Sequence, residues 1–214
     1  FTKKMELQHF TFYNNTETFS DKKEFDVFSK IMFQIEGMST IANAWIINQI
    51  ASKLSNEQTY VNIGCWKGFS LIAGMLNTKC KVFGVDNFAW KDEGKYDFYQ
   101  NFQKFSKPNK HYFYEGDYIK FLNEWDKKKQ YIDFYFYDGP HTYKDQYNAL
   151  DLASNYFQSG SIILVDDTNW KEPREATLEF INNNKSKYKI LADLKCEIAK
   201  HPTYWNGLLI FQKA

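Results

Sequence analysis

The chain has 214 residues, and its 27 basic and 26 acidic side chains leave a net charge of +1. A protein of this length can bury roughly 70% of the surface that its unfolded chain exposes, which favours one domain with a substantial core. The balanced charge speaks against a nucleic-acid binder that depends on a basic surface, and no apolar run approaches the roughly 20 residues of a membrane-spanning helix.

The chain contains three cysteines, Cys65, Cys80 and Cys196, and no pair of them has CxxC spacing. An odd number without this spacing indicates neither a disulfide framework nor a zinc site. No secretory leader is recognisable, so the sequence predicts a cytoplasmic protein.

The first 56 residues are predicted to be mainly helical. Apolar side chains recur at spacings of three and four over residues 24–35, which is typical of a helix with one buried face. Gly37 interrupts this pattern, and either Ser39 or Thr40 can cap a second helix whose apolar positions extend to Leu54.

From residue 59 onward, short apolar runs typical of strands alternate with helical segments. The strands of this alternation are predicted at residues 60–64, 81–86, 110–117, 132–138 and 161–167. Helices are predicted at residues 70–76, 119–125, 147–153 and 175–181, and two closing strands at residues 187–194 and 206–212. Alternating strands and helices form a parallel sheet covered on both faces, while the short link between the last two strands favours an antiparallel pair. The predicted fold is therefore a three-layer α/β fold with an antiparallel last strand.

Each of the five alternating strands ends in a glycine or an acidic residue. These residues are Gly64, Asp86, Asp117, Asp138 and the pair Asp166–Asp167. Ligands of open α/β sheets bind beyond the carboxyl ends of the strands. We therefore expect these residues to line a binding site.

The turn after the first strand reads Gly64-Cys65-Trp66-Lys67-Gly68-Phe69-Ser70. Its glycines have GxxxG spacing rather than the GxGxxG spacing of dinucleotide-binding turns. This favours a group smaller than a pyrophosphate, such as an amino-acid moiety, at the start of the next helix. Asp86 follows Gly64 by 22 residues, where a carboxylate can accept hydrogen bonds from the hydroxyls of a ribose.

The segment Val61–Ser70 resembles motif I of the class I S-adenosylmethionine-dependent methyltransferases, especially that of metal-dependent small-molecule and sugar O-methyltransferases. The resemblance covers about residues 31–213. Its further motifs are Ile35–Ser39, Gly84–Asp86, Glu115–Asp117, Asp133–His141 and Gly160–Asp167. It implies a Rossmann-like sheet of seven strands formed by residues 57–214. It also implies that residues 1–56 form a helical segment over the cofactor and substrate site.

The resemblance assigns S-adenosylmethionine to residues at the ends of the first four strands. They are Ile63, Gly64, Lys67, Gly68, Ser70, Asp86, Asn87, Gly116, Asp117, Tyr118 and Asp138. Asp86 is expected at the ribose, and Asp117 and Tyr118 are expected beside the adenine. Asn62 departs from the family pattern, because many of these enzymes have an acid there that assists at the amine of the cofactor.

Three acids, Asp138, Asp166 and Asp167, end two strands that are neighbours in the family's sheet. Carboxylates about 5 Å apart repel one another unless a cation lies among them, and oxygen ligands suit Mg²⁺. We therefore expect these three residues to bind the metal. His141 follows Asp138 by three residues, and the resemblance implies that this histidine is the general base for a hydroxyl.

The predicted reaction is methyl transfer to a hydroxyl of a small molecule or a sugar, without a nucleic-acid or membrane partner. Aromatic residues in three segments are candidates for the acceptor site: Phe10, Phe12 and Tyr13; Phe88–Trp90; and Asn169–Trp170. Arg174, the single arginine of the chain, is a candidate partner for an acidic group of the acceptor. Two alternatives stay open, an NAD-type oxidoreductase and a non-catalytic module that binds S-adenosylmethionine. A homo-oligomer is open as well.

Overall fold

Residues 22–90, 93–125 and 130–214 are described by a computed structural model of the chain. The predictions for Phe10, Phe12 and Tyr13 lie outside these residues. None of the helices in the described part of the chain combines the length and the apolar character that a bilayer crossing requires. The three cysteines are all described and all free, as their number and spacing predict.

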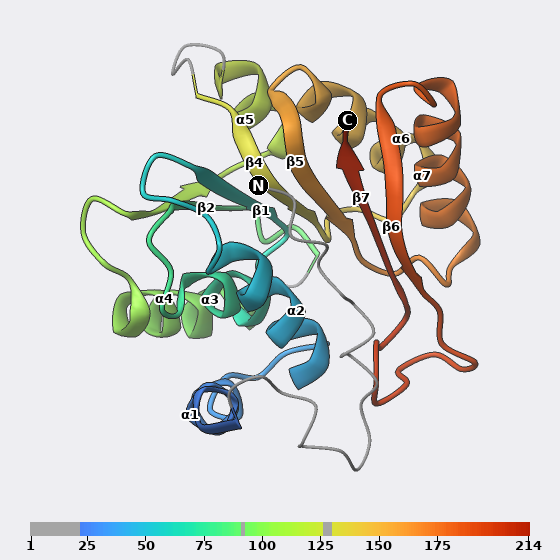
Figure 1. The fold of residues 1–214 in the computed structure, drawn as a ribbon. Coiled ribbons are helices and arrows are strands. Elements are labelled where there is room, and N and C mark those ends of the chain that lie inside the picture. The colour runs from blue at the N-terminus through green and yellow to red at the C-terminus, as the bar shows by residue number, and fades with distance from the viewer. Residues whose placement is uncertain (1–21, 91–92, 126–129) are drawn as a thin grey trace.

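Seven strands of the described chain form one sheet, in the order β3-β2-β1-β4-β5-β7-β6 (Figure 1). They are β1 (Thr59–Ile63), β2 (Lys81–Asp86), β3 (His111–Glu115), β4 (Ile132–Tyr137), β5 (Phe157–Val165), β6 (Tyr188–Leu194) and β7 (Leu208–Lys213). β1 to β5 are parallel, and β7 runs antiparallel between β5 and β6. The predicted three-layer α/β fold with an antiparallel last strand is confirmed.

Helices cover both faces of the sheet (Figure 1). They are α1 (Lys22–Met32), α2 (Ile41–Ala51), α3 (Phe69–Met75), α4 (Glu93–Phe105), α5 (Tyr118–Trp125), α6 (Tyr143–Ser154) and α7 (Lys171–Asn183). α1 to α4 share one apolar core with one face of the sheet, and α5 to α7 share a second core with the other face. Successive strand residues alternate between the cores, so that Phe134 belongs to the first and Tyr135 to the second.

The sequence pattern did not reveal α4. Its buried face consists of aromatic residues, with Phe98 and Phe102 one turn apart and their rings stacked at 5.6 Å. Phe98 also packs against Phe113 of β3, with ring centroids 4.2 Å apart. Helical spacing is present, but aromatic residues favour strands as much as helices, so the pattern alone is ambiguous.

The N-terminus of α2 is joined to the last part of the chain. Thr40, one of the two predicted caps, accepts a hydrogen bond from the Asn43 backbone N–H at 3.1 Å. The Thr40 hydroxyl in turn donates to the backbone oxygen of Thr203, between β6 and β7, at 2.6 Å. The helical N-terminal segment and the β6–β7 connection therefore meet at the carboxyl ends of the parallel strands.

His111 gives the fold a measurable acid sensitivity. Burial, and then the neighbouring Lys107 and Lys110, lower the pKa of His111 to about 4 from an ordinary 6.5. Between these two pH values the unfolded chain binds the proton and the folded chain does not, so the stability from this histidine is lost as pH falls from 6.5 to 4. The loss amounts to about 3 kcal/mol when complete.

His111→Asn keeps an acceptor for the Lys107 backbone N–H, which donates to His111 Nδ1 at 3.0 Å, but it does not titrate. We expect the free energy of unfolding, measured with urea, to fall more steeply between pH 6.5 and 4 for the wild type than for the variant. Equal pH slopes for the two proteins would contradict a neutral, buried His111.

Candidate active site

The turn after β1 touches the chain after β4 at Gly64. This glycine has φ +83°, and a Cβ there would lie 1.9 Å from the backbone oxygen of Asp138. The Asp138 backbone N–H also donates to the backbone oxygen of Ile63 at 2.9 Å. Only glycine permits both this conformation and this approach, so the two loops form one continuous surface.

Asp86, at the end of β2, holds this turn through backbone amides. Its Oδ2 accepts from the N–H groups of Cys65 and Trp66 at 2.7 and 2.8 Å, and its Oδ1 accepts from Phe88 N–H at 2.7 Å. A carboxylate offers about four acceptor positions. In this arrangement Asp86 therefore keeps room at Oδ1 for one ribose hydroxyl rather than for both.

Among the residues predicted to bind the cofactor, Lys67 has a side chain that is already paired with two carboxylates. Its ammonium lies 2.6 Å from a carboxylate oxygen of Glu36 and 2.9 Å from one of Asp97. The hydrogen bond to Glu36, followed by that to Asp97, raises the pKa of Lys67. The lysine thus ties the turn after β1 to the segment before α2 and to α4, and its backbone oxygen also accepts from Asn101 Nδ2 at 2.9 Å.

The residues predicted beside the adenine play clear structural roles. Asp117 Oδ1 accepts from Ile119 N–H at 2.8 Å, which caps the start of α5. The side chain of Tyr118 is only 5% exposed and packs in the core near Tyr137, so its ring has almost no free face for a stacked base. Gly116 N–H donates to the backbone oxygen of Asp86 and joins the ends of β2 and β3.

The other predicted cofactor residues surround the same turn. Gly68 directly precedes α3, and the neighbouring Ser70 is buried within its first turn. Asn87 is exposed after β2, and its Oδ1 accepts from Ala89 N–H at 3.0 Å.

Asn62 is fully buried one residue before the end of β1. Its Oδ1 accepts from the Tyr60 hydroxyl at 2.9 Å, and its Nδ2 donates to the backbone oxygen of Gly64 at 2.7 Å. The amide therefore supports the turn from inside. Both of its polar groups are satisfied without a ligand.

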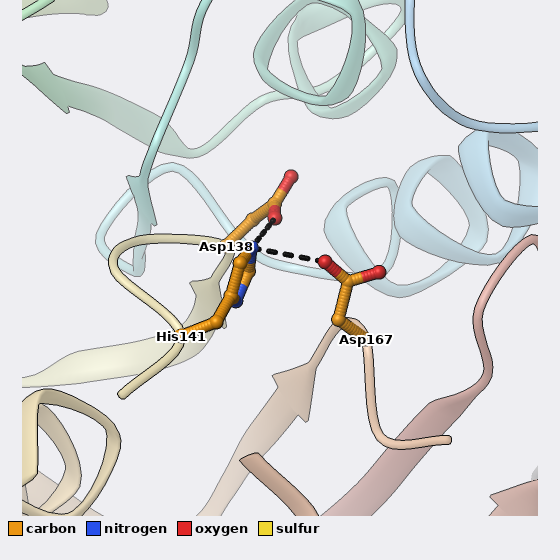
Figure 2. Close-up of side chains that lie close together, drawn as sticks. All are labelled: Asp138, His141 and Asp167. Atoms are coloured by element: carbon orange, nitrogen blue, oxygen red, sulfur yellow. Dashed lines mark ion pairs between the residues drawn. The ribbon is translucent and has the colours of Figure 1, made fainter. Parts of the chain in front are cut away.

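Three side chains converge at the carboxyl ends of β4 and β5 (Figure 2). His141 Nε2 lies 2.9 Å from Asp167 Oδ2 and 3.8 Å from Asp138 Oδ1. Each of the three residues offers a ligand atom within 4.8 Å of the others. Asp138 and His141 come from the loop after β4 and Asp167 from the loop after β5, as the family resemblance predicts.

Asp166 does not join this group, contrary to the predicted metal set. It is 4% exposed, and its Oδ1 accepts from the N–H of Asp167 at 2.8 Å. Asp167 has φ +56°, which turns the chain sharply after β5. The turn directs Asp167 toward His141 and leaves Asp166 in the interior.

Burial and neighbouring negative charge raise the pKa values of two carboxyl groups in this region, Asp138 and Asp166. Loss of hydration, and then the charges of Asp166 and Asp167, raise the pKa of Asp138. The pKa of Asp166 is raised by burial and then by Asp167. Positive charge placed among these groups would relieve the repulsion.

Of the residues predicted to line the acceptor site, some are exposed to solvent and others are buried. Trp90 and Trp170 are 65% and 44% exposed, whereas Phe88 is buried. The Trp170 ring meets the His141 ring edge to face, with centroids 5.2 Å apart. Trp170 also lines a cavity of about 430 Å³ with Thr168, Asn169, Arg174, Lys195, Cys196, Glu197, Ile198 and Ala199.

Arg174 is not a free cation in this cavity. Its guanidinium binds Asp193 of β6 through two hydrogen bonds of 3.1 and 2.7 Å. Such two-point pairing, and the lowered pKa of Asp193 that it causes, commit the arginine to holding α7 against β6. The predicted contact with an acidic acceptor group would have to share the guanidinium with Asp193, whose charge already balances it.

Comparisons with known proteins agree with this architecture. A family model described as a methyltransferase domain matches residues 61–168. No curated protein shows significant sequence similarity to the chain.

Solved structures share the fold at low sequence identity. The O-methyltransferase from Bacillus cereus in complex with S-adenosylhomocysteine is 10% identical, with a TM-score of 0.66 over 94% of this chain and 95% of that one. TomG, an O-methyltransferase of tomaymycin synthesis from Streptomyces achromogenes in complex with S-adenosylmethionine, is 9% identical, with a TM-score of 0.63 over 94% and 93%. An rRNA methylase from Streptococcus thermophilus is 12% identical, with a TM-score of 0.57 over 78% and 93%.

One of these solved proteins is an O-methyltransferase of tomaymycin synthesis and another is an rRNA methylase. The shared fold alone therefore does not identify the acceptor. The sheet order and its antiparallel β7 differ from the all-parallel order of NAD-binding dehydrogenases. The family model spans half of the chain, including the turn after β1 and the loops after β4 and β5. The chain therefore belongs to the methyltransferase-domain family, and it shares the fold of solved O-methyltransferases that bind S-adenosylmethionine or S-adenosylhomocysteine.

Proposed function

We propose that this enzyme transfers a methyl group to a hydroxyl of a small molecule, a sugar being one such acceptor, with the help of a divalent cation. The observation that carries the proposal is the convergence of Asp138, His141 and Asp167 beside Gly64. An oxygen nucleophile must lose a proton as it is methylated. This group combines a potential base with carboxylates that can hold a cation, next to the turn expected to hold the cofactor.

The side chains fit a cation of the Mg²⁺ type. Asp138 and Asp167 provide carboxylate oxygens from two neighbouring strands, and the side chain of Asp138 is 34% exposed. Mg²⁺ commonly binds through one or two carboxylates, with water or substrate in the other positions. After loss of hydration, the charges of Asp166 and Asp167 raise the pKa of Asp138, and a cation at this position would offset those charges.

We assign to His141 the role of the base that takes the proton of the acceptor hydroxyl. Its Nδ1 is buried and has no hydrogen-bond partner among the described residues. For His141 to act as the base, Nδ1 must carry the hydrogen of the neutral ring, and the lone pair of Nε2 must take the proton of the acceptor. Nε2 faces Asp167, whose carboxylate stabilises the imidazolium that forms. Asp138 and Asp167 would bind the cation, and the loop of Gly64 would position the cofactor. When bound, S-adenosylmethionine supplies the methyl group on a sulfonium, and the cation supplies positive charge that favours the deprotonated acceptor.

The acceptor is expected to enter beside Trp170, whose exposed ring borders both His141 and the cavity. An indole face suits a flat or weakly polar ring such as a phenol or a sugar. Residues 22–56, with α1 and α2, lie on the sheet face that carries α3 and α4. We propose that this segment helps to close the cofactor and acceptor site.

The proposal is tested first by binding and then by turnover. We expect calorimetry to show binding of S-adenosylhomocysteine but not of NAD, and binding of Mg²⁺ that Asp167→Asn weakens at least tenfold. Turnover is then followed as S-adenosylhomocysteine release with a panel of phenols, sugars and nucleosides, with and without a chelator.

Each outcome separates the proposal from an alternative. Full activity in chelator would refute the cation. Binding of S-adenosylhomocysteine with no turnover on any hydroxyl compound, with Mg²⁺ or Mn²⁺ present, would favour a non-catalytic module. Methylation of RNA oligonucleotides but not of small molecules would overturn the proposed acceptor class.

A further inference from the structure

Asn206 lies directly against the candidate cation site, although nothing in the sequence pattern singled it out. It is 4% exposed and occupies the end of the connection between β6 and β7. Its Nδ2 donates to Asp167 Oδ1 at 2.7 Å across 39 residues of sequence. The antiparallel pairing of β5 and β7, which aligns Val165 with Leu209, brings the two residues together.

The orientation of the Asn206 side chain is determined by its other bonds. Its Oδ1 accepts from the backbone N–H of Lys200 at 2.8 Å, so Nδ2 must be the atom that faces the carboxylate. Its backbone oxygen accepts from Asn169 N–H at 2.7 Å. The amide is thus held by the connection on one side and by the loop after β5 on the other.

Because of the hydrogen bond from Asn206, the two carboxylate oxygens of Asp167 have different partners. Oδ1 is occupied by the amide of Asn206, and Oδ2 lies 2.9 Å from His141 Nε2. The Asp167 side chain is 9% exposed and its backbone has φ +56°, a conformation that is uncommon outside glycine, Asn and Asp and that a hydrogen bond to the side chain supports. A neutral donor supplies this support without competing for a cation, whereas a lysine in its place would.

We propose that Asn206 is a positioning residue that holds Asp167 as a one-oxygen ligand for the divalent cation. The inference rests on the proposed function, because it requires a cation between Asp138 and Asp167. Groups that orient metal ligands from outside the site typically contribute 10- to 100-fold to metal affinity. The contribution of Asn206 is expected to fall in this range.

The chain offers a matched control in Asn169. Its Nδ2 donates to the backbone oxygen of Cys196 at 2.6 Å, and its Oδ1 accepts from Cys196 N–H at 3.2 Å. Like Asn206, it joins the β6–β7 connection to the loop after β5, but no hydrogen bond links its side chain to Asp167. Asn169→Leu therefore loosens the connection without removing the proposed support.

The experiment measures Mn²⁺ binding to the full chain by calorimetry and by electron paramagnetic resonance, with thermal unfolding recorded for each protein. We expect Asn206→Leu to weaken Mn²⁺ binding 10- to 100-fold and Asn169→Leu to change it less than threefold. Asn206→Ser, whose hydroxyl is too short to reach Asp167, provides the same test if Asn206→Leu does not fold.

Unchanged affinity in folded Asn206 variants, or equal losses in the Asn206 and Asn169 variants, would overturn the inference and leave the proposed function standing. A wild-type protein that binds S-adenosylhomocysteine but not Mn²⁺ would instead refute the cation of the proposed function, and this inference would fall with it.

Discussion

Gly64→Ala is expected to lower the free energy of unfolding by about 3 kcal/mol or more and to abolish binding of S-adenosylhomocysteine. The added Cβ would lie 1.9 Å from the backbone oxygen of Asp138, a distance that no pair of non-bonded atoms tolerates. The left-handed backbone itself costs an alanine about 1–2 kcal/mol, and forced repacking typically adds about 1–3 kcal/mol. Relief requires the loops after β1 and β4 to separate, which takes apart the surface expected to hold the cofactor.

Gly160→Ala is the matched control for this substitution. Gly160 has φ +92°, close to that of Gly64, but a Cβ there would have no neighbour within 4 Å. We expect it to lose only the backbone term of about 1–2 kcal/mol and to keep its affinity for S-adenosylhomocysteine. Chemical denaturation and calorimetry on both variants measure the difference. Equal losses would show that backbone strain, rather than the contact with Asp138, makes Gly64 necessary.

His141→Ala is expected to reduce methyl transfer by about 10²- to 10⁴-fold, the usual contribution of a general base. Affinity for S-adenosylhomocysteine is expected to stay within twofold, because His141 is not among the residues expected to hold the cofactor and its ring faces Asp138 and Asp167 (Figure 2). The rate is measured with an acceptor identified in the panel of hydroxyl compounds, at saturating S-adenosylmethionine.

His201→Ala is the control, because His201 is half-buried in the β6–β7 connection and bonds to Thr203. It is expected to retain most of its turnover. Unchanged turnover in His141→Ala would refute the role as base. A loss of Mn²⁺ affinity that parallels the loss of turnover would instead make Nε2 a ligand of the cation, since its single lone pair cannot serve both purposes.

Much of the fold could be predicted from the sequence because its signals are local. Doubly covered strands are apolar at successive positions, and β2 begins and ends where this pattern places it, at Lys81 and Asp86. Thr40 caps α2 by a contact within one turn of helix. The exception is α4, whose aromatic face gives no clear preference for helix or strand.

The candidate site was predictable only in part, because side-chain direction depends on the tertiary structure. Asp166 and Asp167 are adjacent and chemically identical, and the turn at Asp167 determines which of them faces His141. Arg174 has the charge of an acceptor contact, but α7 packs beside β6 and pairs it with Asp193. The burial of Tyr118 in the second core likewise follows from how α5 packs on the sheet.

The sequence by itself determined the order of the strands and of the helices other than α4, the glycine turn after the first strand and the presence of polar residues at the strand ends. These features depend on short-range backbone preferences and on periodicity, which neighbouring residues encode. Only the tertiary structure decided which of those polar side chains meet, because Asp138 and His141 lie on the loop after β4 and Asp167 lies on the loop after β5. It also added Asn206, which is 39 residues away from its partner in sequence and is brought to it by antiparallel pairing.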